Sequence, residues 1–388
     1  MTGGSTSAGK DSSRSGRCLN VRRLERVART SAIPWGAILR WALLGAVVTC
    51  ALVAGKVVTD PRGSVALLEP GSAGPARAAI HADFPHTPLP AAVGFDGQQF
   101  YAVARDPIHL RSTAANLDRP RYRLQRPLFP LLAWMLHPEG GGTGLIVAFV
   151  GVGVLALLLG GVATGVLSVT LGGSPKLAAV FALLPGAYLS LRYTVADALA
   201  LALTVAAVAA SARDRRRGAL VLAILAVLAK EVSLVVFIGW ALARRTRDRG
   251  ALVFVPAAIA ALWAAFLAVT VPAGDVGSHE LGLPLAGLAN AVTHFWSHDV
   301  ELLGLVCTVG AVALGIAALV RRGLRHPLAW IVVTNLAFVS IMGTDVVGKS
   351  TGAPRSMMPL QLFAIIALAT PAAVLRSHRD RDPALTSK

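Results

Sequence analysis

The chain has 388 residues, of which 55% are hydrophobic and only 15% are charged. This composition is typical of an integral membrane protein and excludes an ordinary soluble domain. A formal net charge of +17 could indicate nucleic-acid binding. The basic residues, however, lie in short groups between apolar runs, which is the pattern that sets membrane topology, so we expect no nucleic-acid partner. Cys18, Cys50 and Cys307 lack metal-ligand spacing, and we expect neither a disulfide nor a cysteine metal site.

The two ends of the chain are expected to be cytoplasmic tails. Residues 1–36 are rich in Ser, Gly and Arg, a composition typical of disorder. The apolar run 38–58 is too long and too far from the start for a cleaved signal peptide, so we expect a retained signal-anchor helix. Residues 37–376 then form a single integral membrane domain of a multi-pass protein in the cell inner (plasma) membrane. Residues 377–388 form the second tail.

Seven further apolar runs approach the length of about 20 residues that crosses a bilayer as a helix. With the basic clusters placed inside, these runs cross alternately, and both termini are cytoplasmic. The sequence therefore predicts an all-α polytopic membrane protein with eight crossings and a large outer loop at 59–137. The seven runs are 143–167, 177–191, 195–212, 251–271, 301–320, 327–347 and 359–375.

The apolar run 219–243 does not fit a single crossing. Basic clusters bound it at both ends, and the positive-inside rule places both of them in the cytoplasm. Lys230 and Glu231 divide the run, and the leading piece spans only about 16 Å, half of the hydrocarbon thickness. We therefore expect a re-entrant broken hairpin whose tip reaches inward from the cytoplasmic side and lines protein or a wet cavity.

This topology gathers the unusual polar residues on the outer side of the membrane. Ionisable groups at membrane depth are costly, so a functional cavity or mutual pairing is the default interpretation. The outer residues are Asp96, Asp106, Arg123 and Arg126 in the first loop; Arg192, Tyr193 and Asp197 in the next turn; Lys230 and Glu231 at the hairpin tip; His279, Glu280, His294, His298 and Asp299 in the basic-free loop; and Asp345, Lys349 and Arg355 in the last loop.

Several of these residues have structural alternatives. Lys230 and Glu231 could neutralise each other as a structural pair. Asp197 could serve as the N-terminal dipole partner of the following helix. Asp106 precedes a proline and could be a turn former. For Asp96, a turn explains the Asp-Gly pair but not the surrounding aromatic residues and the later arginines, so a functional role is favoured.

His294 and His298 lie four residues apart and would share a helix face, a spacing that permits metal binding. Since no HExxH-type frame surrounds them, interfacial histidines beside Trp296 are the favoured interpretation. The sequence predicts no metal site and no cofactor, and it leaves a divalent metal requirement open.

Two motifs in the first outer loop carry a resemblance to a known family. The first is Phe95-Asp96-Gly97-Gln98-Gln99-Phe100-Tyr101, and the second runs from Arg123 through Arg126 to Pro127-Leu128-Phe129-Pro130-Leu131. They resemble the Trp-Asp-Gly…Tyr and Phe-Phe-Pro-Leu signatures of GPI mannosyltransferase II-like proteins and their bacterial relatives in cell-surface glycopolymer formation, within the GT-C membrane glycosyltransferases. The motif match covers about forty residues.

The resemblance implies an inverting transferase that takes a sugar from a polyprenyl-phosphate carrier at the outer face, with Asp96 in the position of the general base. An envelope glycan or lipid would be the acceptor, and membrane lipids would surround the protein. The chain departs from the family in two respects. Phe95 replaces the tryptophan, and the adjacent Asp-Glu pair of protein O-mannosyltransferases is missing, which argues against a protein acceptor.

Such a transfer needs a carboxylate to take the acceptor proton and cations to hold the departing phosphate. Asp106, Asp197 and Glu231 are candidate supporting residues. Tyr101, with Phe100 and Trp134, could stack on a sugar or contact the prenyl chain, and the run 127–137 is expected to be a juxtamembrane helix. The candidate phosphate-binding residues are Arg123, Arg126, Lys230 and Arg355, because guanidinium groups bind phosphate through two points.

Two other functional classes remain open from the sequence. Broken helices and buried charge also mark transporters and lipid-carrier flippases, although no internal repeat is evident. A non-catalytic subunit of an envelope-polysaccharide assembly complex is the third interpretation, in which Asp96 would be dispensable.

Overall fold

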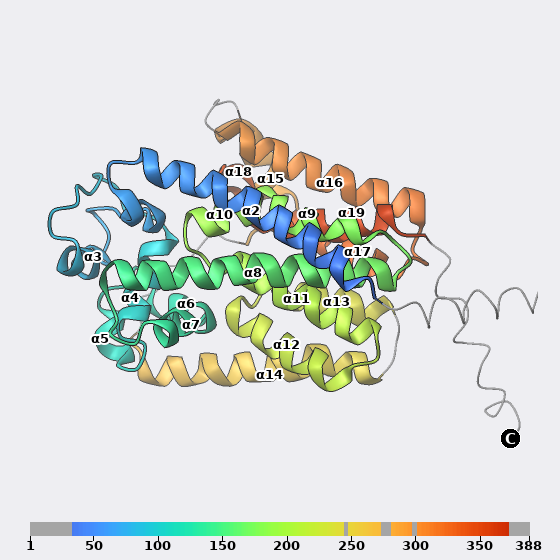
Figure 1. Cartoon of the computed structure of the whole chain (residues 1–388), viewed down its shortest axis with the longest axis horizontal. Coiled ribbons are helices and arrows are strands. Elements are labelled where there is room, and N and C mark those ends of the chain that lie inside the picture. Colours follow the sequence, from blue (N-terminus) through green and yellow to red (C-terminus); the bar gives the residue numbers. More distant parts are fainter. Residues whose placement is uncertain (1–32, 244–246, 273–280, 297–300, 372–388) are drawn as a thin grey trace, which may run out of the picture.

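The computed structural model describes residues 33–243, 247–272, 281–296 and 301–371. Within these ranges the regular elements are all helices, and the only β-type pairing is an isolated bridge between Leu281 and Met342. Figure 1 shows that most of the long helices follow the long axis of the molecule. The expectation of an all-α protein is confirmed.

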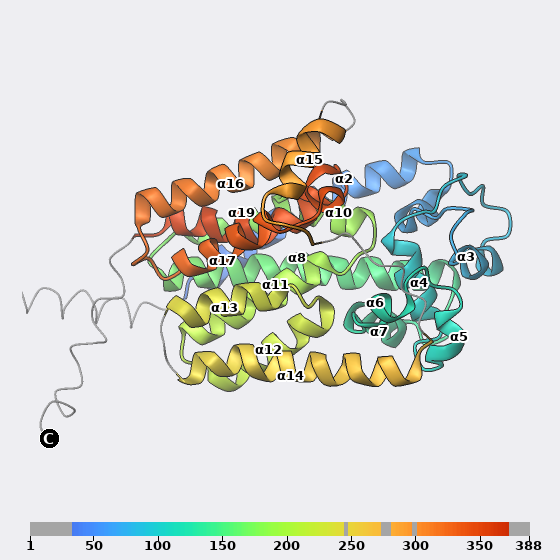
Figure 2. The ribbon, with the colours of Figure 1, turned by 180° about the vertical axis from the view of Figure 1, so that it is seen from behind.

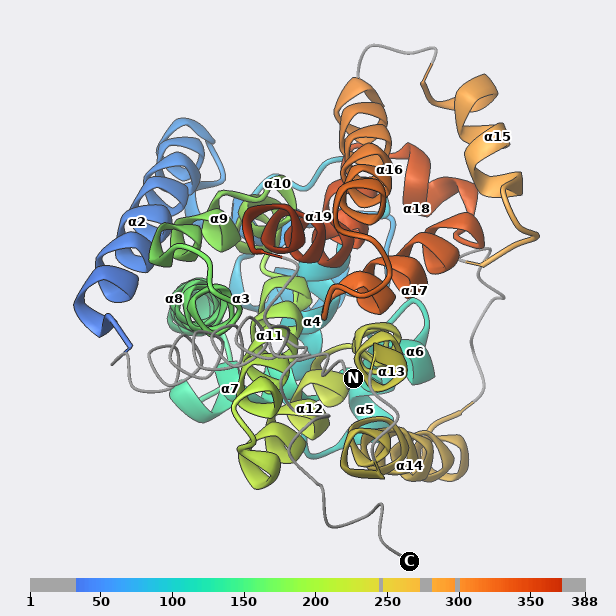
Figure 3. The ribbon, with the colours of Figure 1, turned by 90° about the vertical axis from the view of Figure 1, so that its right-hand side faces the viewer.

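Four described helices are long and apolar enough to cross a membrane. In Figure 3, α2, α14 and α16 lie at the periphery of the bundle, and large apolar side chains such as Phe254, Leu262 and Val269 are exposed on α14. An apolar outer surface of this kind suits lipid rather than water. The four helices are α2 (Trp35–Thr59), α8 (Gly142–Thr170), α14 (Arg247–Thr270) and α16 (Leu302–Arg322).

The remaining apolar runs form shorter helices, of which α11 and α19 are the most buried. Small residues dominate α11, so it packs closely against α8 and the neighbouring helices. These helices are α11 (Asp197–Ala212), α12 (Arg216–Ala229), α13 (Ser233–Ala243), α17 (Ala329–Ser340) and α19 (Ala353–Ala369).

Two runs expected to be single helices are interrupted. The run 177–191 folds as η2 (Pro175–Leu177), α9 (Ala178–Leu183) and α10 (Pro185–Arg192). Leu184 adopts an extended backbone there because the following proline disfavours the helical region. The run 327–347 is also shorter than expected: α17 ends at Ser340, and a separate short helix, α18 (Thr344–Gly348), follows it.

The run 219–243 breaks where the sequence predicts. Helix α12 ends as Lys230 adopts an extended backbone, and α13 begins at Ser233. Lys230 forms an ion pair with Asp197, the first residue of α11. Near the end of α13, Trp240 Nε1 donates a hydrogen bond to Ser211 Oγ (2.9 Å), one residue from the end of α11. The two helices therefore form a hairpin whose tip lies beside the start of α11 (Figure 2).

The first long loop folds as a helical cap over one end of the bundle, on the left in Figure 1. Phe129 joins the cap to the bundle, because its ring lies 5.6 Å from that of Phe100 in the cap and 5.1 Å from that of Phe149 on α8. The C-terminal ends of α8, α11 and α16 lie at the opposite end of the molecule (Figure 1). The cap contains η1 (Gly63–Leu68), α3 (Arg77–Asp83), α4 (Asp96–Arg105), α5 (Leu110–Ala114), α6 (Pro120–Leu124) and α7 (Leu128–Leu136).

Candidate functional site

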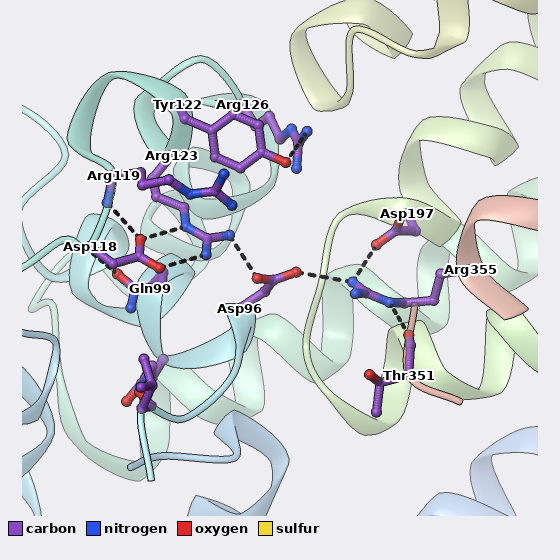
Figure 4. Close-up of polar contacts among 12 residues, drawn as sticks. Asp96, Gln99, Asp118, Arg119, Tyr122, Arg123, Arg126, Asp197, Thr351 and Arg355 are labelled. Carbon is purple, nitrogen blue, oxygen red and sulfur yellow. Dashed lines mark hydrogen bonds and ion pairs between the residues drawn. The ribbon is translucent and has the colours of Figure 1, made fainter. Parts of the chain in front are cut away.

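Asp96 lies between two arginines where the cap meets the bundle (Figure 4). Its Oδ1 accepts a hydrogen bond from Nη1 of Arg123 at 2.7 Å, and its Oδ2 accepts one from Nη1 of Arg355 at 3.2 Å. Arg123 belongs to α6 in the cap, whereas Arg355 belongs to the first turn of α19, more than two hundred residues later. Asp96 therefore links two parts of the chain that are remote in sequence.

The network continues from Arg355 into the bundle. Nη1 of Arg355 also donates to Oδ2 of Asp197 at 3.1 Å, and Asp197 forms a close ion pair with Lys230 at the hairpin tip. Nε of Arg355 donates to the carbonyl oxygen of Thr351 at 2.8 Å, which fixes the guanidinium plane. Two carboxylates thus share one arginine, and each has a second cation of its own.

On the cap side, Asp118 holds Arg123 through two hydrogen bonds of 2.9 Å, from Nε and Nη2. The Asp118 carboxylate also accepts a hydrogen bond from the backbone N–H of Arg119 at 2.7 Å, while Oε1 of Gln99 accepts one from the backbone N–H of Asp118 at 3.3 Å. Arg123 is therefore oriented by Asp118 and presents its remaining nitrogen to Asp96 (Figure 4).

A further ion pair, between Arg126 and Glu231, lies beside these residues, and the eight charged side chains together are called the network below. Arg126 donates from Nε to one oxygen of Glu231 at 3.0 Å and from Nη2 to the other at 2.6 Å. Nη2 of Arg126 also donates to the hydroxyl of Tyr122 at 2.8 Å, and the Arg126 guanidinium lies 4.4 Å from the centre of the Tyr122 ring. Cation–π contact and the fork-like hydrogen bonds both restrain the guanidinium.

Helix termini position several of these charges. Asp96 and Asp197 are the first residues of α4 and α11, where the partial positive charge of the helix N-terminus favours a carboxylate. Lys230 follows the last residue of α12, where the helix dipole favours a cation. The dipole interpretation of Asp197 is thus consistent with the structure, and Asp197 is also part of the network.

Two residues of the first motif, Phe95 and Gln98, hold the start of α4 in place. The ring of Phe95 lies 4.8 Å from the guanidinium carbon of Arg355 and 4.7 Å from the Tyr193 ring. The buried amide of Gln98 accepts from the backbone N–H of Gly71 at 3.1 Å and donates to the Val93 carbonyl at 2.6 Å. These contacts fix the loop that precedes α4 and, with it, the position of Asp96.

Arg123 and Arg126 are more buried than Asp96 and Glu231, to which they bind. The side chains of Arg123 and Arg126 are 9% exposed, whereas Asp96 is 24% and Glu231 is 39% exposed. Burial alone would raise the pKa of Asp96, but the charges of Arg123 and Arg355 hold it well below its usual range. Asp96 is therefore ionised at neutral pH.

The structure brings together seven of the nine residues that the sequence singled out. Lys230 and Glu231 turn to different partners, Asp197 and Arg126, so the simple neutral pair between them is not what forms. The seven residues are Asp96, Arg123, Arg126, Asp197, Lys230, Glu231 and Arg355.

Tyr101 and Asp106 lie outside the network. Tyr101 is fully buried, and its hydroxyl donates to Oδ2 of Asp83 at 2.5 Å, so the ring is not available to a ligand. Asp106 follows the end of α4, where its exposed carboxylate lies 2.8 Å from Nδ1 of His109 and also accepts from the backbone N–H of that residue. This arrangement agrees with the turn-forming alternative, and we leave both residues out of the site.

Arg192, Asp345, Lys349 and His294, which the sequence also places on the outer side, make their contacts elsewhere. Arg192 donates to Glu69 at 3.1 Å and to a cap carbonyl, Asp345 pairs with Lys349 at 3.3 Å on the surface, and His294 contacts its own helix. Within the described ranges, no three His, Cys, Asp or Glu side chains are grouped as metal ligands. His279, Glu280, His298 and Asp299 fall outside the described residues.

The sequence does not predict the roles of Asp118 and Tyr122 in the site. It also does not predict that Phe95 contacts Arg355. Asp118 offered a signal, because it lies five residues before Arg123 and close to three arginines in the sequence. The contact of Phe95 with Arg355 had no signal, since it depends on how α19 packs against the cap.

Searches of known protein families, of characterised proteins and of solved structures find no match for this chain. The function of this chain is therefore inferred from the network itself. Asp96, Asp118, Asp197 and Glu231 carry four negative charges, and Arg123, Arg126, Lys230 and Arg355 carry four positive charges. The arrangement places a carboxylate beside several guanidinium groups, the two kinds of group that a proton transfer next to a bound anion requires.

Proposed function

We propose that the protein is an integral membrane glycosyltransferase of the GT-C type, which moves a sugar from a polyprenyl-phosphate carrier to an envelope glycan or lipid acceptor. One observation carries the proposal: the Asp96 carboxylate is bound between Arg123 and Arg355, where the cap meets the first turns of α11 and α19. A base and its phosphate-binding cations are needed within one site for this reaction.

In the proposed reaction, Asp96 accepts the proton of the acceptor hydroxyl as the hydroxyl oxygen attacks the anomeric carbon of the sugar. The bond between that carbon and the phosphate oxygen breaks, and its electron pair stays on the phosphate. Arg123, Arg126, Lys230 and Arg355 stabilise the negative charge that develops there. Attack opposite the leaving group inverts the anomeric configuration.

For the membrane arrangement, we propose eight crossings with the cap at the outer face and the hairpin of α12 and α13 entering from the cytoplasm. The basic residues at 213–217 and at the end of α16 support this orientation. Helix α7 exposes Leu131, Met135 and Leu136 along the cap, which suits an interfacial helix beside a lipid carrier. Reporter fusions at positions 215 and 247 should both indicate the cytoplasm, and a fusion at Gly94 the outer face.

A transporter of an anionic lipid or solute is the second candidate. It is favoured by the broken hairpin, which carries ionised side chains to its tip inside a helical bundle. A transporter has no need of Asp96 as a base, so the two candidates differ in what Asp96 does.

The test of the proposed function is chemical. Cell-envelope glycans of a deletion strain are compared with those of the parent by linkage analysis and mass spectrometry. If the protein is a transferase, the deletion strain should lack one sugar linkage in its glycans, while the rest of the polymer and its lipid carrier are still made. A transporter predicts instead that the whole precursor accumulates at the inner face. Unchanged glycans in the deletion strain would reject both candidates.

A further inference from the structure

The ion pair between Arg126 and Glu231 differs from the rest of the network in its exposure. The Glu231 side chain is 39% exposed, compared with 24% for Asp96 and 6% for Asp197. Asp96 and Asp197 each bridge two cations, and Arg355 is common to both. Glu231 is therefore the network carboxylate that an incoming ligand reaches most directly.

The geometry of the pair resembles that of a bound phosphate. Both oxygens of Glu231 face the Nε and Nη2 atoms of Arg126, at 3.0 and 2.6 Å. Two oxygens of a phosphate group bind the same side of a guanidinium in the same two-point manner. The contacts of Arg126 with Tyr122 hold the guanidinium from another direction and would persist if Glu231 moved away.

Charge balance also favours the replacement of the Glu231 carboxylate by an incoming anion. The eight charged groups of the network sum to zero, and each of its four cations already contacts a carboxylate, so an anion that binds one of these cations competes with that carboxylate. Separating Asp197 would remove the carboxylate partner of Lys230 and leave Arg355 with Asp96 alone, which is costly inside the bundle. Glu231 is partly exposed and is not the ion-pair partner of Lys230, so its displacement would leave the ion pair of Lys230 with Asp197 intact and the hairpin tip attached to α11.

We propose that Arg126 is the phosphate subsite of this protein. In the absence of ligand, the carboxylate of Glu231 occupies this subsite, and a phosphate displaces it. This inference rests on the proposed function for the identity of the ligand as a phosphate-bearing lipid. Glu231 then weakens phosphate binding, in contrast to a residue that contacts the ligand favourably. Its removal should increase affinity for phosphate.

The experiment measures binding to the purified full-length protein in nanodiscs, with farnesyl phosphate and inorganic phosphate as separate probes. Glu231→Gln keeps the size of the side chain and removes its charge, and we expect a Kd about tenfold lower than that of the wild type. The additional change Arg126→Ala should abolish the gain. A gain with farnesyl phosphate alone identifies a lipid headgroup as the ligand, and a gain with both probes identifies the phosphate group itself.

The variant Glu231→Asp distinguishes two effects of Glu231 on phosphate binding: its contact with Arg126 and its negative charge. It retains the negative charge but shortens the side chain by one methylene, so the two-point contact with Arg126 is weakened. We expect an intermediate gain in affinity. If Glu231→Gln tightens binding and Glu231→Asp does not, the charge alone is responsible and the displacement model is wrong.

Glu69→Gln is the matched control. Glu69 is 34% exposed and pairs with Arg62 and Arg192 in the cap, outside the network, so binding should not change. Equal or weaker binding by Glu231→Gln would reject the subsite while leaving the transferase proposal standing. If no form of the protein binds either probe, both the subsite and the phosphate donor of the proposed function are wrong.

Discussion

Gly97 lies against Tyr193 so closely that a Cβ atom at position 97 would come within 2.3 Å of the Tyr193 carbonyl oxygen. The same atom would lie 2.8 Å from Oγ1 of Thr194, whose backbone has a positive φ of 48°. The turn between α10 and α11 therefore packs directly on the first turn of α4. This contact places Asp96 beside Asp197 and explains why a glycine must follow the aspartate.

The first prediction concerns this contact. Gly97→Ala should force α4 away from the turn before α11, because both opposing atoms are held by the backbone or by a buried side chain. We expect Asp96 to shift relative to Arg355, with a loss of activity of about 10²-fold from misplacement alone. Glycan restoration in the deletion strain measures this loss. Gly63→Ala in the same cap, where a Cβ atom has open space but the backbone φ is +57°, tests whether backbone strain alone has the same effect.

How far the sequence predicts this fold depends on the kind of signal. Hydropathy locates α2, α8, α14 and α16 to within a few residues, since each is a continuous apolar helix. It does not reveal the break before Pro185, because proline and its apolar neighbours leave the hydropathy of that run high. The break at Lys230 was predictable because two charged residues interrupt an apolar run.

In the candidate site, too, the sequence predicts some features and the fold decides others. Topology alone predicts that the charged residues of the outer loops share one side of the membrane, and the structure brings seven of them together. Tyr101, which the motif offers as a contact for a sugar or the prenyl chain, lies five residues after Asp96 in a helix, so it points about 140° away and enters the cap core. Asp118 was missed because its role depends on the fold of the cap around α6.

The second prediction concerns the buried charge of Lys230. Asp197→Asn should leave Lys230 and Arg355 without one of their carboxylates in a buried site. We expect a loss of about 3 kcal/mol in stability, measured by thermal unfolding in detergent. Asp197→Asn combined with Lys230→Met should recover part of that loss, since the double change removes the uncompensated cation. If Asp197→Asn alone unfolds at the wild-type temperature, Asp197 does not balance the charge of Lys230.

A third prediction follows from the acids of the cap. The hydrogen bond from the Arg62 side chain lowers the pKa of Asp60 to about 2. Burial alone would raise the pKa of Asp118, but the hydrogen bonds and charge of Arg123 lower it. A lowered pKa in the folded state means that the stabilisation is complete above the unfolded-state pKa of about 4. It is lost as the pH falls through the folded-state values.

The contribution of these pairs to the melting temperature should therefore be constant between pH 7 and pH 5, and it should decline below about pH 4. Asp118→Asn should flatten part of that acid decline, because asparagine does not titrate. A decline centred near pH 6 that disappears in Asp118→Asn would contradict the assignment.

The last prediction tests Asp96 as the base. Asp96→Asn preserves the size of the side chain and can still accept a hydrogen bond from Arg123 or Arg355, but it cannot accept a proton at neutral pH. Loss of general-base assistance typically lowers a rate by about 10²–10⁴-fold. The variant should reach the membrane in normal amount and fail to restore the missing glycan. Asp106→Asn is the control, because that exposed carboxylate lies outside the network and asparagine also suits turns.

The Asp96→Asn change would also leave Arg123 and Arg355 less fully paired, so a loss of activity could reflect a displaced arginine instead of a missing base. The two explanations differ in binding. A missing base leaves the affinity for farnesyl phosphate equal to or higher than that of the wild type, because the guanidinium groups remain and one negative charge is gone. A collapsed site lowers that affinity together with the activity. Full glycan restoration by Asp96→Asn at native abundance would remove the catalytic role and favour a transporter or an assembly subunit, for which an ionised base at this position is not required.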